Sequence, residues 1–346
     1  MKTSAICSPV TLRDIATELS VSHSTVSRAL KNATNISLER RKMIQEAARK
    51  MGYRPNAMAT QLGHQRHASQ KHPISSEIAW LNYWNEPKKL RSFAEFNLYW
   101  KGASERAEEG GYRLEQFVCD EAISPSRLER ILLARNIHGI LIPPHGDVPP
   151  SGWDKVDWEK FSIVRLGYSV PTPRSHLVTS NHLTCGMLAI ESMWRLGYKR
   201  VGFVGRTNKH PHLRAGFLLK EALHIKEPPP IFTFLTQDNY VEKLPAFSKW
   251  LKKSRLDAIL SDSSDTRMML DQLGYRVPDD IGLASTSILD GNADAGINQN
   301  SEEIGKAAME TLISLLNNNQ YGIPKIVREV LITGAWVDGS TLPPRK

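Results

Sequence analysis

Apolar positions near the start of the chain follow a helical spacing in two short segments. The first segment begins with Thr11 and Asp14, which have the spacing of a capping box. Its apolar side chains share one helical face: Leu12, Ile15, Ala16 and Leu19. Ser22 can cap the second segment, whose buried side comprises Val26, Ala29 and Leu30. The pattern predicts two short helices joined by a tight turn.

The outer face of the second helix carries polar side chains and no acidic ones: His23, Ser24, Thr25, Ser27, Arg28 and Asn32. Base edges in the major groove offer hydrogen-bond acceptors, donors and thymine methyl groups, so a donor-rich helix face suits that groove. The alternative is an ordinary helical hairpin on a protein surface. Arg28 can donate two hydrogen bonds to a guanine, whereas His23 and Ser24 leave the base preference open.

Two further helical segments follow. Ser37 can cap a helix from about 38 to 51, and Gly52 can end it. A helix of about two turns then fits between Pro55 and Gly63, and it is too short to be stable without a partner. Residues 64–76 are polar and aperiodic, which is typical of a linker; a solvated linker is favoured over a metal site for its histidines.

From Glu77 onward the chain alternates between strand and helix patterns. Strands are expected at 78–83, 113–118, 139–143, 161–166, 200–204, 231–235, 258–260 and 281–284. Helices are expected at 99–110, 126–135, 184–196, 214–223, 247–253, 266–273 and 302–316. Repeated strand–helix alternation predicts parallel sheets with helices on both faces, and this length suggests two such units.

Most of the net positive charge lies in the N-terminal fifth of the 346 residues. Residues 1–72 hold 12 of the 45 Lys and Arg residues but only 4 of the 36 Asp and Glu residues. The net charge is therefore +8 for this part and +1 for the remainder. Such asymmetry indicates a nucleic-acid-binding head on a near-neutral body. The head lacks the apolar aromatic face of a membrane-surface segment.

Composition indicates a cytoplasmic protein without cofactors. No apolar run has the length of a membrane span, and the N-terminus lacks a signal-peptide core. Cys7, Cys119 and Cys185 are far apart and odd in number, which fits a reducing compartment and no metal site. No catalytic motif is present, and the His-Pro-His at 210–212 is interpreted as a loop, so the chain is predicted not to be an enzyme.

Three ordered motifs resemble the DNA-binding head of the lactose-repressor/galactose-repressor family of bacterial transcription regulators. They are V-T-L-x-D-I-A at 10–16, V-S-x-S-T-V-S-R-A-L at 21–30 and E-A-A-x-x-M-G-Y-R-P-N-A-M-A-x-x-L at 46–62. The resemblance implies that His23, Ser24 and Arg28 read bases. It also implies that a hinge helix enters the minor groove at Ala59 and Leu62, where Leu62 and its copy in a dimer part a base step.

The remaining expected DNA contacts fix position on phosphates or support the helices. With the base readers and hinge residues, the full expected set is Leu12, Ser22, His23, Ser24, Thr25, Ser27, Arg28, Asn32, Asn56, Ala59 and Leu62.

The same family joins its head to a two-lobed fold similar to periplasmic sugar-binding proteins. Matching segments lie at 111–115, 138–143, 196–204, 277–281 and 302–308. The implied organisation is a helix-turn-helix domain at 1–54, a hinge and linker at 55–76 and a two-lobed effector and dimerisation domain at 77–340. The N-lobe is expected at 77–177 and 299–326 and the C-lobe at 178–298 and 327–340, with crossings near 178, 298 and 326.

A small-molecule effector is expected in the cleft at the carboxyl ends of the strands. Aromatic side chains after the first strand can stack on sugar rings, although packing in the core is an equal alternative. The candidate effector residues are Trp84, Phe96, Tyr99, Tyr168, Asn181, Arg214, Ser263 and Ser287. The chain departs from the family at several effector positions: Ser180 replaces an acid, and 262–264 and 285–288 lack the usual acidic and amide groups. These departures argue against transferring a sugar specificity.

Together these observations predict a DNA-binding transcriptional regulator, most simply a repressor. It is expected to bind a near-palindromic operator as a homodimer and to respond to a small, sugar-like effector. The alternative is a small-molecule binding protein without a DNA-dependent function.

Overall fold

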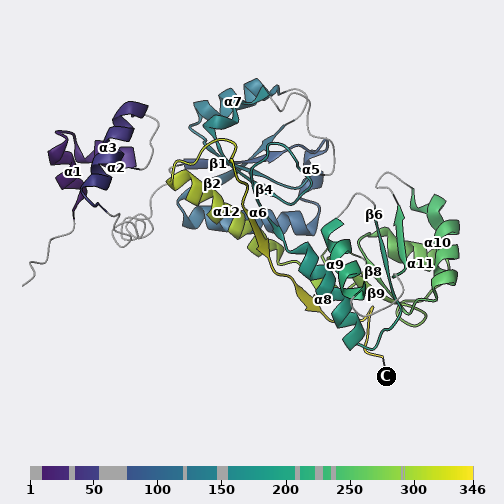
Figure 1. Ribbon diagram of the computed structural model, residues 1–346. Helices are drawn as coiled ribbons and strands as arrows, with labels where there is room; N and C mark the ends of the chain where they lie inside the picture. Colours follow the sequence, from purple (N-terminus) through teal and green to yellow (C-terminus); the bar gives the residue numbers. More distant parts are fainter. Residues whose placement is uncertain are drawn as a thin grey trace, which may run out of the picture.

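The computed structural model describes the head and the two lobes of the body (Figure 1). The described ranges are 10–30, 36–53, 76–119, 123–145, 155–206, 211–222, 229–234, 239–289, 291 and 293–345.

The described part of the head contains three helices around a small apolar core. They are α1 (Leu12–Glu18), α2 (His23–Leu30) and α3 (Leu38–Lys50). The core contains Ile15, Ala16, Val26, Ala29, Ile36, Ile44 and Ala48. The expected caps are present: Thr11 and Asp14 form a capping box, and Ser37 Oγ accepts a hydrogen bond from the amide of Arg40. Local capping therefore determines where these helices begin.

Within the described ranges, the body contains two six-stranded sheets. The first sheet has the order β11-β5-β4-β3-β1-β2 and is parallel throughout. Its strands are β1 (Ser76–Asn82), β2 (Tyr112–Val118), β3 (Gly139–Ile142), β4 (Ser162–Leu166), β5 (His176–Ser180) and β11 (Glu329–Ile332). The second sheet has the order β12-β10-β9-β8-β6-β7, and only the β10–β12 pair is antiparallel. Its strands are β6 (Val201–Arg206), β7 (Ile231–Phe234), β8 (Ala258–Ser261), β9 (Gly282–Ser285), β10 (Gly296–Asn298) and β12 (Ala335–Val337).

Helices cover both faces of each sheet, and each lobe has two hydrophobic clusters. The helices of the first lobe are α5 (Pro87–Leu90), α6 (Ala94–Glu109), α7 (Pro125–Ala134), the 3-10 turn η2 (Trp158–Lys160) and α12 (Ser301–Asn317). Those of the second lobe are α8 (His182–Arg195), α9 (Pro211–Ala222), α10 (Tyr240–Ser254) and α11 (Asp265–Gln272). This arrangement confirms the predicted fold class of a helical head and a two-lobed α/β body. No helix in the described part of the chain is long and apolar enough to cross a membrane.

The chain crosses between the lobes three times, and one of the expected positions needs correction. β5 lies entirely in the first sheet, so the first crossing follows Ser180, close to the expected position near residue 178. The second crossing lies between β10 and α12, as expected near residue 298. The third crossing lies at 333–334, between β11 and β12, and not near residue 326. β11 was missed because its residues are largely exposed and lack an apolar alternation.

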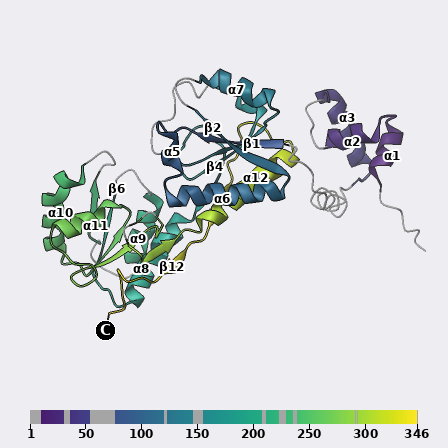
Figure 2. The same cartoon turned by 180° about the vertical axis from the view of Figure 1, so that it is seen from behind.

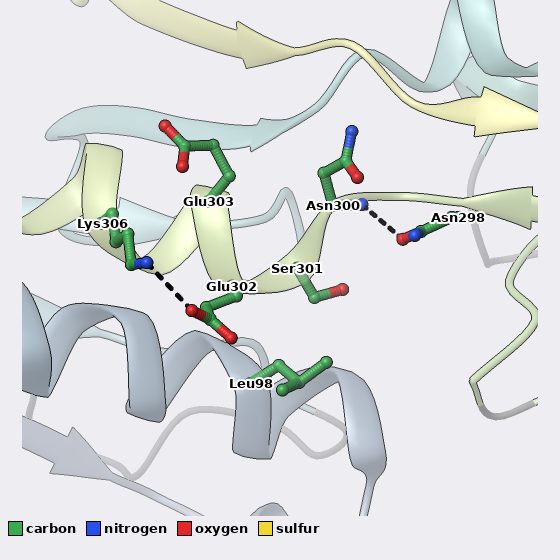
Figure 3. Close-up of a pocket in the computed structure, with 7 residues that line it drawn as sticks. All are labelled: Leu98, Asn298, Asn300, Ser301, Glu302, Glu303 and Lys306. Atoms are coloured by element: carbon green, nitrogen blue, oxygen red, sulfur yellow. Dashed lines mark hydrogen bonds and ion pairs between the residues drawn. The ribbon is translucent and has the colours of Figure 1, made fainter.

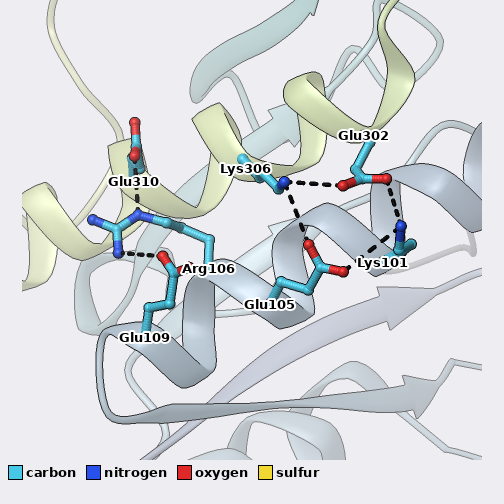
Figure 4. Close-up of polar contacts among 7 residues, drawn as sticks. All are labelled: Lys101, Glu105, Arg106, Glu109, Glu302, Lys306 and Glu310. Atoms are coloured by element: carbon cyan, nitrogen blue, oxygen red, sulfur yellow. Dashed lines mark hydrogen bonds and ion pairs between the residues drawn. The ribbon is translucent and has the colours of Figure 1, made fainter.

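Helices α6 and α12 lie side by side along the first lobe in both views (Figures 1 and 2). A chain of ion pairs follows their outer seam (Figure 4). Glu302 accepts hydrogen bonds from Lys101 (2.7 Å) and Lys306 (2.9 Å), and Arg106 donates to Glu310 (2.9 Å). These bonds from the two lysines lower the pKa of Glu302 to about 2. Because these ion pairs are largely solvated, we expect them to contribute little to the free energy of unfolding and mainly to align α6 with α12.

Candidate DNA interface and ligand pocket

The N-terminus of α2 is fixed by a cluster of hydroxyl groups. Ser22 Oγ accepts a hydrogen bond from the amide of Thr25 (3.1 Å) and lies 2.8 Å from Thr25 Oγ1 and 2.9 Å from Ser24 Oγ. The apolar side of the helix, Val26 and Ala29, is buried in the head core. The opposite side is thereby held outward on a rigid three-helix support.

The outward face of α2 is rich in hydrogen-bond donors. His23, Ser24 and Arg28 are exposed, whereas Thr25 and Ser27 are half-buried at its margin. Arg28 Nε donates to the carbonyl of Ser24 (3.3 Å), which steadies the guanidinium on the helix surface. No described residue accepts a hydrogen bond from its two terminal amino groups. This geometry leaves the fork of Arg28 available for a planar acceptor pair such as guanine O6 and N7.

The other expected DNA contacts have different surroundings. Leu12, in the first turn of α1, packs against the head core, and Ser22 is exposed at the start of α2. Asn32, Asn56, Ala59 and Leu62 lie outside the described residues, as do the linker histidines.

Aromatic side chains at the carboxyl end of β1 form a packed cluster in the first lobe. Trp84 is 7% exposed, and its indole nitrogen donates to the carbonyl of Pro144 (3.1 Å). Its ring centroid lies 5.5 Å from that of Phe93, and Phe96 lies 5.8 Å from Tyr99. Trp84 and Tyr99 are buried and Phe96 is half-buried. These three side chains therefore pack in the core of the first lobe, which was the alternative to stacking on a sugar ring.

Most of the other effector candidates have local structural partners. Asn181 Oδ1 caps α8 by accepting from the amide of Thr184 (3.3 Å). Ser263 Oγ accepts from the amide of Asp265 (3.3 Å), and Ser287 Oγ accepts from the amide of Leu289 (3.4 Å). Arg214 is half-buried on α9. Asn181, Ser263 and Ser287 therefore each take part in a local hydrogen bond at the end of a strand or the start of a helix.

Tyr168 differs because it joins the two lobes. Its ring lies 4.5 Å from that of His212 on α9, and its hydroxyl donates to Glu329 Oε2 (3.1 Å). Burial, followed by the nearby Glu329 carboxylate, raises the pKa of Tyr168 to about 12. The phenol therefore stays protonated and can keep donating throughout the physiological range.

The second lobe presents a polar network that motif reasoning missed. Asp262 Oδ1 accepts from Thr286 Oγ1 (2.9 Å), and the carbonyl of Thr286 accepts from the side-chain amide of Gln299 (3.1 Å). Arg206 pairs with Asp265, and both side chains are largely buried. The position of these residues at the carboxyl ends of β6, β8 and β9 could have indicated the network from the sequence. The network was not predicted because the acidic and amide residues usual in the family are absent there.

A pocket of about 500 Å³ lies where β10 leads into α12 (Figure 3). Leu98 of α6 lines the pocket on the side opposite the start of α12. The other lining residues come from the second crossing and the first two turns of α12: Asn298, Asn300, Ser301, Glu302, Glu303 and Lys306. None of the effector candidates lines it. A hydroxyl, amides and charged groups around an apolar side chain can bind a small polar molecule.

Comparisons with known proteins identify the two parts of the chain. Residues 11–56 match the model of bacterial regulatory proteins of the lacI family, and residues 190–341 match the periplasmic binding protein-like domain. The chain therefore joins a lacI-family head to a periplasmic-binding-protein-like body. It is thus a DNA-binding transcriptional regulator with a helix-turn-helix head.

Curated relatives match this chain along nearly its whole length. The transcriptional regulator MalR of Streptococcus pneumoniae is 26% identical over 90% of this chain and 94% of its own. Catabolite control protein A of Staphylococcus xylosus is 24% identical over 92% and 96% of the two chains.

Solved structures share the fold of this chain. A complex of the transcriptional regulator CelR with cellobiose has a TM-score of 0.59 and 17% identity, covering 96% of this chain and 99% of its own. The lac repressor dimer bound to operator and an anti-inducer has a TM-score of 0.55 and 18% identity, covering 97% and 99%.

Proposed function

We propose that this chain is a cytoplasmic repressor that binds a near-palindromic operator as a homodimer. The observation that carries the proposal is the exposed donor face of α2, which is anchored by Ser22 and contains His23, Ser24 and Arg28. A dimer would place two copies of α2 in successive major grooves. The net charge of +8 in residues 1–72 would bring the heads to the phosphate backbone.

The resemblance to the family supplies the connection between head and body. In this proposal the DNA-binding domain spans 1–54, and residues 55–76 form the hinge and linker. Asn56, Ala59 and Leu62 act at the hinge, where Leu62 and its copy open a base step in the minor groove. One structural relative is a dimer bound to its operator, which supports the same arrangement here.

A small-molecule effector would regulate this binding by changing how the lobes are oriented. Three chain crossings and the Tyr168–His212 contact connect the lobes, so a ligand at the crossings can bias their relative orientation. One structural relative is a complex with cellobiose, which supports a sugar-like effector. In this proposal the body extends from 77 to 340, with the lobe boundaries at the observed crossings.

A salt titration tests the DNA-binding part of the proposal. The full chain should bind a random duplex at low salt and lose affinity steeply as salt rises, because bound lysines and arginines displace counterions. Selection from a random duplex pool should then return a near-palindromic sequence. Absence of duplex binding at low salt would instead favour a small-molecule binding protein without a DNA-dependent function.

A further inference from the structure

Ser301, the first residue of α12, has a buried hydroxyl. The residue is 1% exposed, and no residue in the described part of the chain forms a hydrogen bond with Ser301 Oγ. Its side chain lines the pocket at the start of α12 and points toward the space between Asn298 and Leu98 (Figure 3). A buried unpaired hydroxyl is costly, so a ligand that accepts a hydrogen bond there would recover that cost.

The backbone around Ser301 supplies further unpaired donors. Asn300 is the N-cap residue, but its side chain makes no capping bond and instead donates to the carbonyl of Thr333 (2.8 Å). Its own amide donates to Asn298 Oδ1 (2.9 Å). In the described part of the chain, no group accepts a hydrogen bond from the amides of 301–303. These amides form the positive end of a helix of 17 residues.

The acidic residues of this first turn do not occupy those donors. Glu302 is turned toward Lys101 and Lys306, with which it makes hydrogen bonds of 2.7 and 2.9 Å. Glu303 is exposed and points away from Ser301 (Figure 3). Lys306 also lines the pocket. The hydroxyl and amide donors at the start of α12 are therefore not occupied by these carboxylates.

We propose that this pocket binds the oxyanion of a small acidic effector, either a carboxylate or a phosphate ester. Ser301 Oγ and the amides at the start of α12 are the donors, and Leu98 contacts the apolar part of the ligand. An array of donors at a helix N-terminus favours an anion over a neutral hydroxyl, which must also donate. The inference rests on the proposed function and narrows its effector from sugar-like molecules to acidic ones, such as sugar acids or sugar phosphates.

Thermal unfolding of the full chain with simple anions tests this site. Inorganic phosphate and acetate serve as probes of the two oxyanion classes, each compared with chloride at equal ionic strength. At least one probe should raise the Tm, and the class with the larger effect identifies the ligand. No shift with either anion would overturn the proposal.

Three variants locate the effect at Ser301. Ser301→Ala should weaken the apparent affinity for the anion about tenfold, because it removes a hydrogen bond to a charged group. Ser301→Asp should abolish the response, since its carboxylate would repel the probe. Ser314→Ala, an exposed serine on the same helix, should respond as the wild type does. An unchanged response in Ser301→Ala and Ser301→Asp would refute the site.

A head variant separates this site from the DNA-binding surface, which can also attract phosphate. Arg28→Ala should retain the Ser301-dependent anion response, and Ser301→Ala should retain binding to random duplex at low salt. Loss of anion binding alone would refute the pocket while leaving the proposed function intact. Loss of duplex binding in the wild type would refute the proposed function and leave the pocket to be judged by its own titration.

Discussion

The ring of Tyr168 in the first lobe lies 4.5 Å from the ring of His212 in the second, at the start of α9. The tyrosine hydroxyl also donates to Glu329 at the start of β11. This contact lies outside the three covalent crossings, so it adds a non-covalent constraint on lobe orientation.

Removing the Tyr168 ring should loosen the two lobes. Tyr168→Ala loses both the ring contact and the hydrogen bond, whereas Tyr168→Phe keeps the ring. We expect a larger radius of gyration by small-angle X-ray scattering for the alanine variant, because it removes a contact that holds the two lobes together. The phenylalanine variant should match the wild type. Identical scattering from all three proteins would contradict this role.

The phenol of Tyr168 should also lose its proton at an unusually high pH. Burial, with a smaller effect from Glu329, raises its pKa to about 12, above the usual value of about 10. The folded state thus favours the protonated phenol, and its contribution to the free energy of unfolding is present below about pH 10 and is lost as the pH rises toward 12. The absorbance difference at 295 nm between wild type and Tyr168→Phe measures this titration. A midpoint near pH 10 would contradict the assignment.

Asp294 should stabilise the C-terminal segment of the second lobe. It accepts four hydrogen bonds of 2.8 Å, from the amide and hydroxyl groups of Ser340 and Thr341. Burial raises the pKa of Asp294, but these four bonds outweigh it and hold the pKa well below its usual range. The stabilisation is therefore present above pH 4 and is lost as the pH falls further.

Asp294→Asn should lower the free energy of unfolding by about 1–2 kcal/mol at neutral pH, since the residue is solvent-exposed and screening limits the effect. Denaturant unfolding at pH 7 and pH 4 measures the loss. Asp279→Asn, on an exposed loop, is the matched control and should be close to neutral. Equal stability of the Asp294 variant and wild type would show that the four bonds contribute nothing.

Close packing of α6 on α12 depends on two glycines. A Cβ atom at Gly305 would lie 2.1 Å from the carbonyl oxygen of Tyr99, and one at Gly102 would lie 2.0 Å from that of Glu302. Gly305→Ala should destabilise the fold by about 1–3 kcal/mol, because the helices must separate. At a solvent-exposed helix position a Gly→Ala change stabilises by about 1 kcal/mol. The sign of the change in the free energy of unfolding therefore shows whether the helices are in close contact. Chemical denaturation measures it, with Ser314→Ala on the exposed face as control; a more stable Gly305→Ala protein would rule out the close contact.

The head was predictable because its signals are local. Thr11, Asp14 and Ser37 determine helix starts through contacts three residues away, and each cap lies where the sequence predicts it. β5 and β11 were not predictable in the same way. β5 is a short, mixed segment whose burial comes from neighbouring elements, and β11 is an exposed edge strand recognised only by its pairing with β5.

The ligand pocket was less accessible to sequence reasoning. Aromatic residues such as Trp84 can face a cleft or a core, and composition does not distinguish the two; the fold places Trp84 in the core. A serine at a helix start usually indicates a cap. Here Asn300 is the N-cap residue, and Ser301 begins the helix with a hydroxyl that has no partner among the described residues. Whether the cap is Asn300 or Ser301 depends on the backbone conformation at the crossing, which the local sequence pattern does not predict.

Base reading by Arg28 should be separable from its charge. Arg28→Lys keeps the positive charge but loses the planar fork that matches guanine, and Arg28→Ala loses both. Both variants should relax the preference at one symmetry-related base pair in each half-site, with a loss of about 1–3 kcal/mol in discrimination. The lysine variant should keep the wild-type affinity for random duplex. Arg49→Ala, which removes an equal charge from α3, should leave the base preferences unaltered. Sequencing of bound fragments from a random pool measures each profile, and a wild-type profile from Arg28→Ala would exclude Arg28 as a reader of bases.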